Sequence, residues 1–102
     1  MKKIYLKDKY LKILKNIFEQ CLQNQKCEIM LLGSRATGQC LEMSDIDIAI
    51  KSIDGVQPKL YKIKNMLEES IIPFTADVLN YFDVPDNWKK SIDKTGILIW
   101  KN

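Results

Sequence analysis

The sequence contains no histidine, and this absence narrows the chemistry open to it. Histidine is the commonest general base near neutral pH and the commonest metal ligand, including for zinc. Any catalysis by this chain must therefore use carboxylates, hydroxyls, lysines, backbone amides and hard metal ions.

Cysteine is scarce as well. The three cysteines, Cys21, Cys27 and Cys40, do not have the paired spacing of a zinc site. An odd number also argues against a framework of disulfides. We expect three free thiols that pack as small hydrophobic side chains.

Long apolar runs are absent too. No stretch approaches the roughly 20 apolar residues that a membrane-spanning helix needs. At the start of the chain, lysines and an aspartate interrupt every apolar stretch. The start therefore lacks the unbroken apolar segment of about 7–15 residues found in a signal peptide. We expect a cytoplasmic protein with no membrane partner, and its 102 residues predict a single domain, 1–102.

The net charge of +3 comes from lysines spread along the chain rather than gathered in one segment. Proteins that bind nucleic acid usually concentrate positive charge, so we do not expect nucleic acid as a partner. Arg35 is the only arginine among 16 basic residues. It lies in the segment GSRATG, where a planar, bidentate donor suits phosphate, although a side chain that faces solvent is the alternative.

Apolar side chains recur with a helical period in 8–25 and again in 58–70. In the second helix the buried stripe is predicted to contain Leu60, Ile63, Leu67 and Ile71, and Pro73 ends the segment. A short third helix is expected after 83–85 and closes at Gly96. Residues 34–38 form a loop or a single helical turn that ends at Gly38.

Strands are predicted at 28–33, 45–51 and 74–82, and 97–100 is a last strand or an extended tail. The resulting order of elements predicts an α/β (α+β) protein in which helices cover a small mixed sheet.

Three aspartates have the strand positions that a metal site requires. The alternation in 45–51 places Asp45, Asp47 and Ala49 on one face. Alternate residues of a strand are about 7 Å apart, so these two carboxylates can converge on a pair of Mg²⁺ ions. Asp77, in the middle of the next predicted strand, is placed to be a third ligand. The alternative is that each aspartate simply faces water.

Gly33 and Ser34 end the first strand and open a turn. A glycine here lets backbone amides and a hydroxyl approach a triphosphate closely. The alternative is an ordinary turn in which Ser34 caps the next helix. The segment is not a P-loop, because no Gly-Lys-Ser/Thr follows.

Gly33-Ser34, the ten residues 35–44 and then Asp45-Ile46-Asp47 form a more specific pattern than any of these parts. The pattern resembles the G-S-x10-D-x-D signature of the DNA polymerase beta-like nucleotidyltransferase superfamily. The stretch GSRATGQCLEMSDIDIAI is most similar to the minimal nucleotidyltransferases of prokaryotes, and Asp77 stands where that family has its third carboxylate.

The resemblance implies a polymerase beta-like nucleotidyltransferase fold and a role for each motif residue. Gly33, Ser34 and Arg35 would bind the phosphates of ATP, and Asp45, Asp47 and Asp77 would be catalytic and hold two Mg²⁺ ions. It further implies that AMP is transferred to a hydroxyl, with Asp77 accepting the proton.

Such proteins are commonly paired with a HEPN-domain protein encoded next to them. In the characterised pairs that protein is a toxin, and the nucleotidyltransferase, its antitoxin, uses ATP to adenylylate a tyrosine of the toxin. The alternative is that the chain is a non-catalytic nucleotide-binding module that neutralises or assembles with its partner by contact alone. A third interpretation, transfer to a small molecule, lacks support because the sequence shows no acceptor-binding domain. Trp88 and the apolar tail 97–100 are candidate partner contacts, with core packing as the alternative use of each.

Overall fold

The computed structural model describes residues 3–55 and 57–102, so the first two residues and Val56 of the predicted domain lie outside it. The elements follow the predicted order: α1 Asp8–Leu22, β1 Cys27–Leu32, α2 Ser34–Thr37, β2 Ile46–Ser52, α3 Leu60–Glu69, β3 Ala76–Asn80, the 3-10 turn η1 Tyr81–Asp83, α4 Asp86–Thr95 and β4 Ile97–Lys101. The predicted α/β class is therefore confirmed, and the tail forms a strand.

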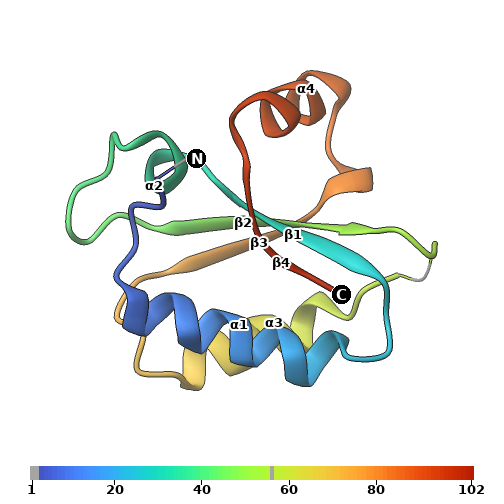
Figure 1. Ribbon diagram of the computed structural model, residues 1–102, viewed down its shortest axis with the longest axis horizontal. Helices are drawn as coiled ribbons and strands as arrows, with labels where there is room; N and C mark the ends of the chain where they lie inside the picture. The colour runs from blue at the N-terminus through green and yellow to red at the C-terminus, as the bar shows by residue number, and fades with distance from the viewer. Residues whose placement is uncertain (1–2, 56) are drawn as a thin grey trace.

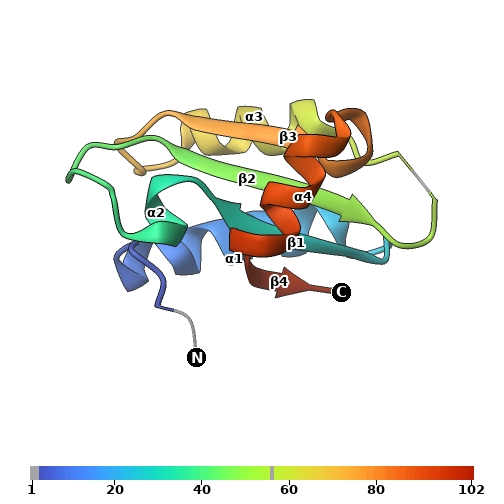
Figure 2. The ribbon, with the colours of Figure 1, turned by 90° about the horizontal axis from the view of Figure 1, so that it is seen from above.

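The four strands make one mixed sheet with the order β3-β2-β1-β4. Strand β1 pairs antiparallel with both β2 and β4, whereas β2 and β3 are parallel and α3 connects them. Helices α1 and α3 lie side by side beneath one face of this sheet, and α4 lies over the other (Figure 1). Seen from above, α4 crosses the strands at a steep angle (Figure 2).

The main core lies between the sheet and the pair α1 and α3. The side chains that alternate inward from β2, Ile46, Ile48 and Ile50, are fully buried there, as their period of two predicts. Leu14 and Phe18 of α1 meet them from the helix side and are also fully buried. These contacts fill the space between the centre of the sheet and α1.

The second helix differs from the prediction at its C-terminal end. Helix α3 ends at Glu69, and Ser70 is extended, with its hydroxyl donating a hydrogen bond to the Leu67 carbonyl at 2.6 Å. The helical period stops there, so the expectation that Ile71 is buried was wrong. Ile71 is 77% exposed, and Ile72, one residue further along the extended chain, packs into the core.

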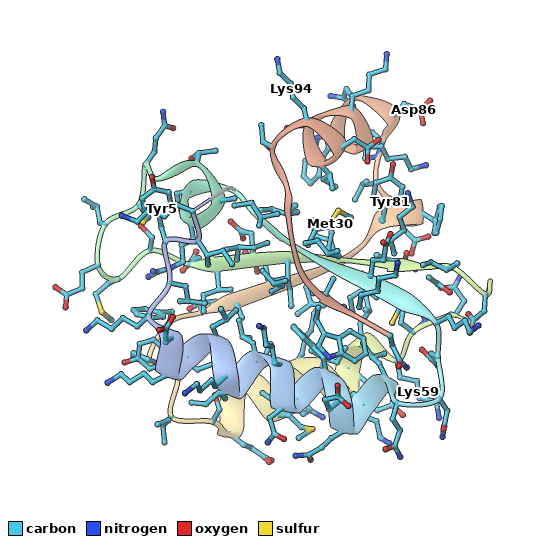
Figure 3. The ribbon with its side chains drawn as sticks, in the orientation of Figure 1. Tyr5, Met30, Lys59, Tyr81, Asp86 and Lys94 are labelled. Carbon is cyan, nitrogen blue, oxygen red and sulfur yellow. The ribbon has the colours of Figure 1, made fainter. Side chains whose placement is uncertain are left out.

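The opposite face of the sheet carries a smaller apolar cluster, formed by Leu32, Ala49, Tyr81 and Ile92. Its anchor is Tyr81, whose hydroxyl donates to both carboxylate oxygens of Asp93 at 3.0 Å. Burial, together with this bond and the charge of Asp93, raises the pKa of Tyr81. Tyr81 and Met30 lie between the sheet and α4 (Figure 3), so this cluster fixes the position of that helix.

The cysteines behave as the sequence predicts, since all three are free. Cys21 packs against Met66 with its sulfur 3.4 Å from the methionine sulfur, which joins α1 to α3. Cys27 is buried, and burial, reinforced by the charge of Asp54, raises the pKa of its thiol to about 11. Within the described residues, no helix is both long and apolar enough to cross a membrane.

Candidate active site

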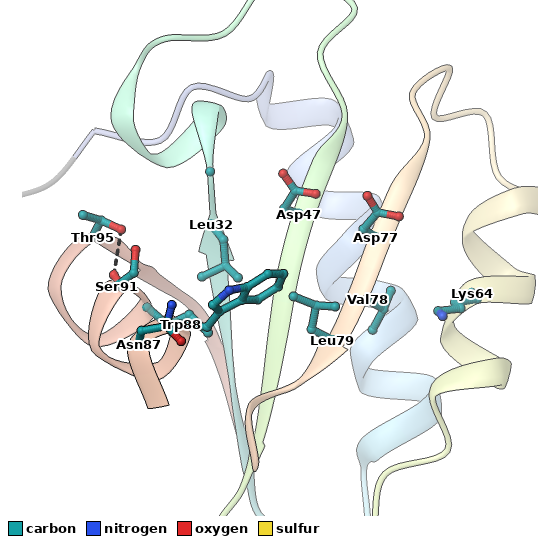
Figure 4. A pocket seen from close by; sticks show the side chains of 12 residues that line it. Leu32, Asp47, Lys64, Asp77, Val78, Leu79, Asn87, Trp88, Ser91 and Thr95 are labelled. Atoms are coloured by element: carbon teal, nitrogen blue, oxygen red, sulfur yellow. Dashed lines mark hydrogen bonds between the residues drawn. The ribbon is translucent and has the colours of Figure 1, made fainter. Parts of the chain in front are cut away.

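Asp47 and Asp77 lie side by side in one row across the sheet. They are direct partners in the parallel pairing of β2 with β3, and Asp47 is opposite Leu32 in the antiparallel pairing with β1. Neighbouring strands are about 4.8 Å apart, and side chains in one row point to the same face. Figure 4 shows both carboxylates at the same end of their strands. We call Asp47 and Asp77 the acidic pair.

Gly33 brings the backbone against this pair. Its φ of 64° and ψ of −147° fall in a region that is essentially restricted to glycine. A Cβ atom at this position would lie 2.7 Å from Oδ2 of Asp47, which is closer than van der Waals contact allows. The sequence therefore needs glycine here for two reasons, the backbone conformation and the space taken by the carboxylate.

Gly33 is also the N-cap of α2, and Ser34 is the first residue of that single helical turn. The alternative in which Ser34 caps the helix was therefore wrong, and no side chain caps it. The N–H groups of Ala36 and Thr37 donate to the Gly33 carbonyl at 3.1 Å, whereas the Ser34 amide, which comes first, has no acceptor within the turn and can bind an external group. Gly38 ends the turn with a φ of 90°, as predicted, and its N–H donates to the Ser34 carbonyl at 2.8 Å.

Negative charge accumulates at this edge of the sheet. Partial burial raises the pKa of the Asp47 carboxyl, and the charge of Asp77, a hydrogen bond between the two side chains and the charge of Asp45 raise it further. Asp45 itself is exposed and lies one residue before β2 begins. Bringing a cation to this position would relieve the repulsion that the three aspartates create.

The donor set suits Mg²⁺. Within 3–55 and 57–102, no group of three or more His, Cys, Asp or Glu side chains is already arranged around a metal position. Mg²⁺ does not require such a cage, because it is usually held by one or two carboxylates together with water and the phosphates of a substrate. The acidic pair, with Asp45 close by and the Gly33 backbone against it, fits that pattern.

Arg35 occupies a different environment from the one predicted. Its side chain is only 5% exposed, and its guanidinium donates to the carbonyls of Tyr5, Glu42 and Ser44 at 2.9–3.1 Å. The same group lies over the Phe74 ring, 4.2 Å from its centroid. These contacts contradict the solvent-facing alternative and argue against a phosphate contact, because the donors already have backbone acceptors.

The contacts of Arg35 instead join the segments that carry the site. Ser44 immediately precedes Asp45, Phe74 lies three residues before Asp77, and Arg35 itself follows the Gly33-Ser34 turn. The Arg35 carbonyl also accepts a hydrogen bond from the Tyr5 N–H at 2.9 Å. Arg35 is therefore a positioning residue that holds three parts of the site in one arrangement.

A pocket of about 590 Å³ opens beside the acidic pair, between the sheet and α4. Figure 4 shows Asp47 and Asp77 at one end of it and the indole of Trp88 over its middle. Of the residues that line the pocket, Lys64 of α3 is the only basic one. A volume of this size is typical of sites for small molecules and cofactors.

Sequence reasoning missed most of the α4 side of this pocket. Asn87, Ser91 and Thr95 line it at a spacing of four residues, and Trp88 and Ile92 follow the same spacing one position later. The sequence alone therefore shows that α4 has a polar stripe next to an apolar one. This pattern does not reveal which face of the sheet the helix covers, so the pocket could not be located from the sequence.

Comparison with known proteins places the chain in a family. The family model for polymerase beta, nucleotidyltransferase, matches residues 7–102. This chain belongs to the polymerase beta nucleotidyltransferase family. The resemblance predicted from the Gly33-Ser34 and Asp45-Ile46-Asp47 motifs is thereby confirmed. No curated protein sequence matches the chain at a significant level.

Solved nucleotidyltransferase-like structures share its fold. A chain from a toxin–antitoxin crystal structure with AMP-PNP superposes with a TM-score of 0.72 at 17% identity, covering 90% of this chain and 73% of that one. A complex of a tri-AMPylated Shewanella oneidensis HEPN toxin with an MNT antitoxin gives a TM-score of 0.59 at 16% identity, with coverage of 90% and 73%. A putative nucleotidyltransferase from Sulfolobus solfataricus gives 0.53 at 27% identity, covering 92% and 82%.

Proposed function

We propose that this chain transfers AMP from ATP to a hydroxyl group of a partner protein, with Mg²⁺ bound at its aspartates. The observation that carries the proposal is the approach of the Gly33 backbone to Asp47 beside Asp77, because a Cβ at residue 33 would lie 2.7 Å from the Asp47 carboxylate. The proposal is supported by backbone amides that can bind phosphate next to carboxylates that can bind a cation, beside a pocket whose volume is typical of small-molecule sites.

The turn binds the triphosphate. Backbone amides at Gly33 and Ser34, together with the Ser34 hydroxyl, donate hydrogen bonds to the β- and γ-phosphates. Lys64 lines the pocket together with Asp77 and contributes positive charge close to the phosphates. Arg35 has no direct part in this binding, because its guanidinium is used to hold the surrounding segments.

Asp45, Asp47 and Asp77 hold the metal ions, two as in related two-metal sites. When bound, Mg²⁺ supplies neutralisation of the charge on the phosphate oxygens of the nucleotide. The raised pKa of Asp47 supports this role, since a carboxylate crowded by other carboxylates gains most from a nearby cation.

The transfer itself needs one proton acceptor. The acceptor hydroxyl loses its proton to the Asp77 carboxylate as its oxygen forms a bond to the α-phosphorus. The bond from the α-phosphorus to the bridging oxygen breaks, and pyrophosphate leaves with that electron pair. No histidine exists in the sequence to take the proton, so a carboxylate performs this step. Positioning and charge neutralisation supply much of the acceleration.

The partner is a HEPN-domain protein encoded next to this chain, and the acceptor is one of its tyrosines. This part of the proposal is supported by the fold shared with the MNT antitoxin found in complex with a tri-AMPylated HEPN toxin. ATP as the donor is supported by the toxin–antitoxin structure with AMP-PNP. By modifying its partner, the chain acts as an antitoxin.

Intact-mass spectrometry of the HEPN-domain protein tests the proposal directly. The protein is incubated with the full chain, ATP and Mg²⁺, and a mass gain of one or more AMP units is expected. Asp47→Asn should abolish the gain. Asp83→Asn is the matched control, because Asp83 is exposed, lies beyond the opposite end of β3 and does not line the pocket.

Two results would contradict the proposal. A stable complex that forms without any mass gain, although ATP binds, would favour the contact-based module. An Asp47→Asn variant that still modifies its partner would remove the acidic pair from the mechanism.

A further inference from the structure

The pocket changes character along its length. The acidic pair and Leu32 form one row of the sheet at one end of the pocket. Further along the same face, Leu79 lines the pocket together with Trp88 and Ile92 of α4. A ligand that extends along the pocket meets carboxylates at one end and apolar side chains at the other. A nucleotide has the same division, with charged phosphates at one end and a flat aromatic base at the other.

Trp88 lies over the apolar part of this pocket. It projects from the first turn of α4, lines the pocket with Leu79 and Ile92, and remains 50% exposed. Figure 4 shows its ring between α4 and the strands, near Leu79 and Leu32. A large aromatic side chain with this much exposed surface inside a pocket is available to a ligand rather than used in packing.

The other tryptophan differs. Trp100 is only 8% exposed, packs against Phe18 in the main core and donates from Nε1 to Glu19 at 3.2 Å. The core-packing alternative is therefore correct for Trp100 and wrong for Trp88. Since α4 is fixed to the sheet by Ile92 and by the Tyr81–Asp93 bond, the Trp88 backbone is held in place before any ligand arrives.

We infer that Trp88 is the stacking platform for the nucleobase of the bound nucleoside triphosphate. The inference rests on the proposed function, because it assigns the second half of the same substrate. Every nucleobase has a π-face, and stacking on an aromatic side chain is a general way of binding one. With the phosphates at Gly33 and Asp47, the length of the pocket directs the base toward α4.

Binding measurements separate the base from the phosphates. ATP and tripolyphosphate, which has no base, are titrated by calorimetry in Mg²⁺ against the full chain and two variants. We expect Trp88→Ala to weaken ATP binding roughly tenfold or more and to leave tripolyphosphate binding unchanged. Trp88→Phe keeps an aromatic face and should stay within about threefold of the unmodified chain for ATP.

Phe82→Ala is the matched control for loss of an aromatic side chain. Phe82 is also 50% exposed, but it lies on η1 and does not line the pocket. Its removal should leave both affinities unchanged. Tryptophan fluorescence gives a second readout, because ATP but not tripolyphosphate should change the emission, and Trp88→Phe should remove that change while Trp100 still emits.

Several outcomes would overturn the inference. Unchanged ATP affinity in Trp88→Ala would place the base elsewhere, and equal weakening of ATP and tripolyphosphate would make the role of Trp88 structural. Unchanged ATP affinity with lost binding of the HEPN-domain protein would make Trp88 a partner contact. If ATP binding depends on Trp88 but no AMP is transferred, the inference holds and the proposed function fails.

Discussion

The two faces of the sheet differ in how completely helices cover their side chains. Beneath α1 and α3, inward side chains such as Ile46, Ile48 and Phe18 are completely buried in a continuous core. Above the sheet, α4 covers only a small cluster and leaves a pocket of about 590 Å³. We call the face beneath α4 the open face and the face that packs on α1 and α3 the closed face. Alternate residues of β2 point to opposite faces, so Asp47 lies on the open face, between Ile46 and Ile48 of the closed face.

This difference separates stability from function within a short chain. The closed face supplies the buried apolar surface on which folding depends. The open face holds crowded carboxylates, a glycine in a restricted conformation and a tryptophan that leaves half of its surface exposed. Substitutions on the two faces should therefore have different consequences, and each of the following experiments tests that separation.

The largest effect on stability is expected from Phe18→Ala on the closed face. Phe18 is fully buried against Trp100, and removing such a ring costs about 3–5 kcal/mol of unfolding free energy. Phe82→Ala, which removes a half-exposed ring, should cost well below that. Urea denaturation measures the unfolding free energy of both variants. Similar losses in the two would contradict the claim that stability depends mainly on the closed face.

Arg35→Lys should affect both stability and transfer, because Arg35 connects the segments around the site. A lysine cannot satisfy the carbonyls of Tyr5, Glu42 and Ser44 together, so we expect a loss of about 2–3 kcal/mol. AMP transfer should fall roughly tenfold or more in kcat as the aspartates lose their alignment. A loss of ATP affinity with unchanged stability would instead indicate a phosphate contact.

The smallest expected effect is a dependence of the unfolding free energy on pH. Because the pKa of Asp47 is raised, the folded chain binds more protons than the unfolded chain just above the ordinary carboxylate pKa of about 3.9. Stability should therefore fall as pH rises from that value through the raised pKa, and Asp47→Asn should not show this component. Denaturation without Mg²⁺ measures the unfolding free energy of both proteins. The amount by which Asp47→Asn exceeds the unmodified chain should grow as pH rises from about 3.9 through the raised pKa, and should then stay constant.

Local patterns and motif spacing predicted much of the fold and identified the aspartates that the structure brings together in the candidate site. The alternation in β2 identifies which face Asp47 occupies, and the spacing from Gly33 to Asp47 carries the family resemblance. What could not be predicted depends on contacts between distant segments. The Arg35 side chain meets Tyr5 and Phe74, which lie 30 and 39 residues away (35 − 5 and 74 − 35), and no local signal specifies those partners.

The same reason explains why Ile71 was predicted wrongly and why the use of Trp88 could not be decided from the sequence. The apolar period continues through Ile71, but a hydrogen bond from Ser70 to the Leu67 carbonyl ends the helix first. Trp88 and Trp100 are both aromatic residues near the end of the chain, and only the packing of α4 and β4 places one at a pocket and the other in the core. The single domain expected over 1–102 remains a prediction.

The most direct test of the separation between the two faces is to measure AMP transfer and unfolding free energy in the same preparation of Asp47→Asn. The account predicts that transfer to the HEPN-domain protein falls at least about a hundredfold, whereas stability at neutral pH without Mg²⁺ is equal to or higher than that of the unmodified chain. Retained transfer, or a loss of transfer accompanied by a loss of stability, would contradict it.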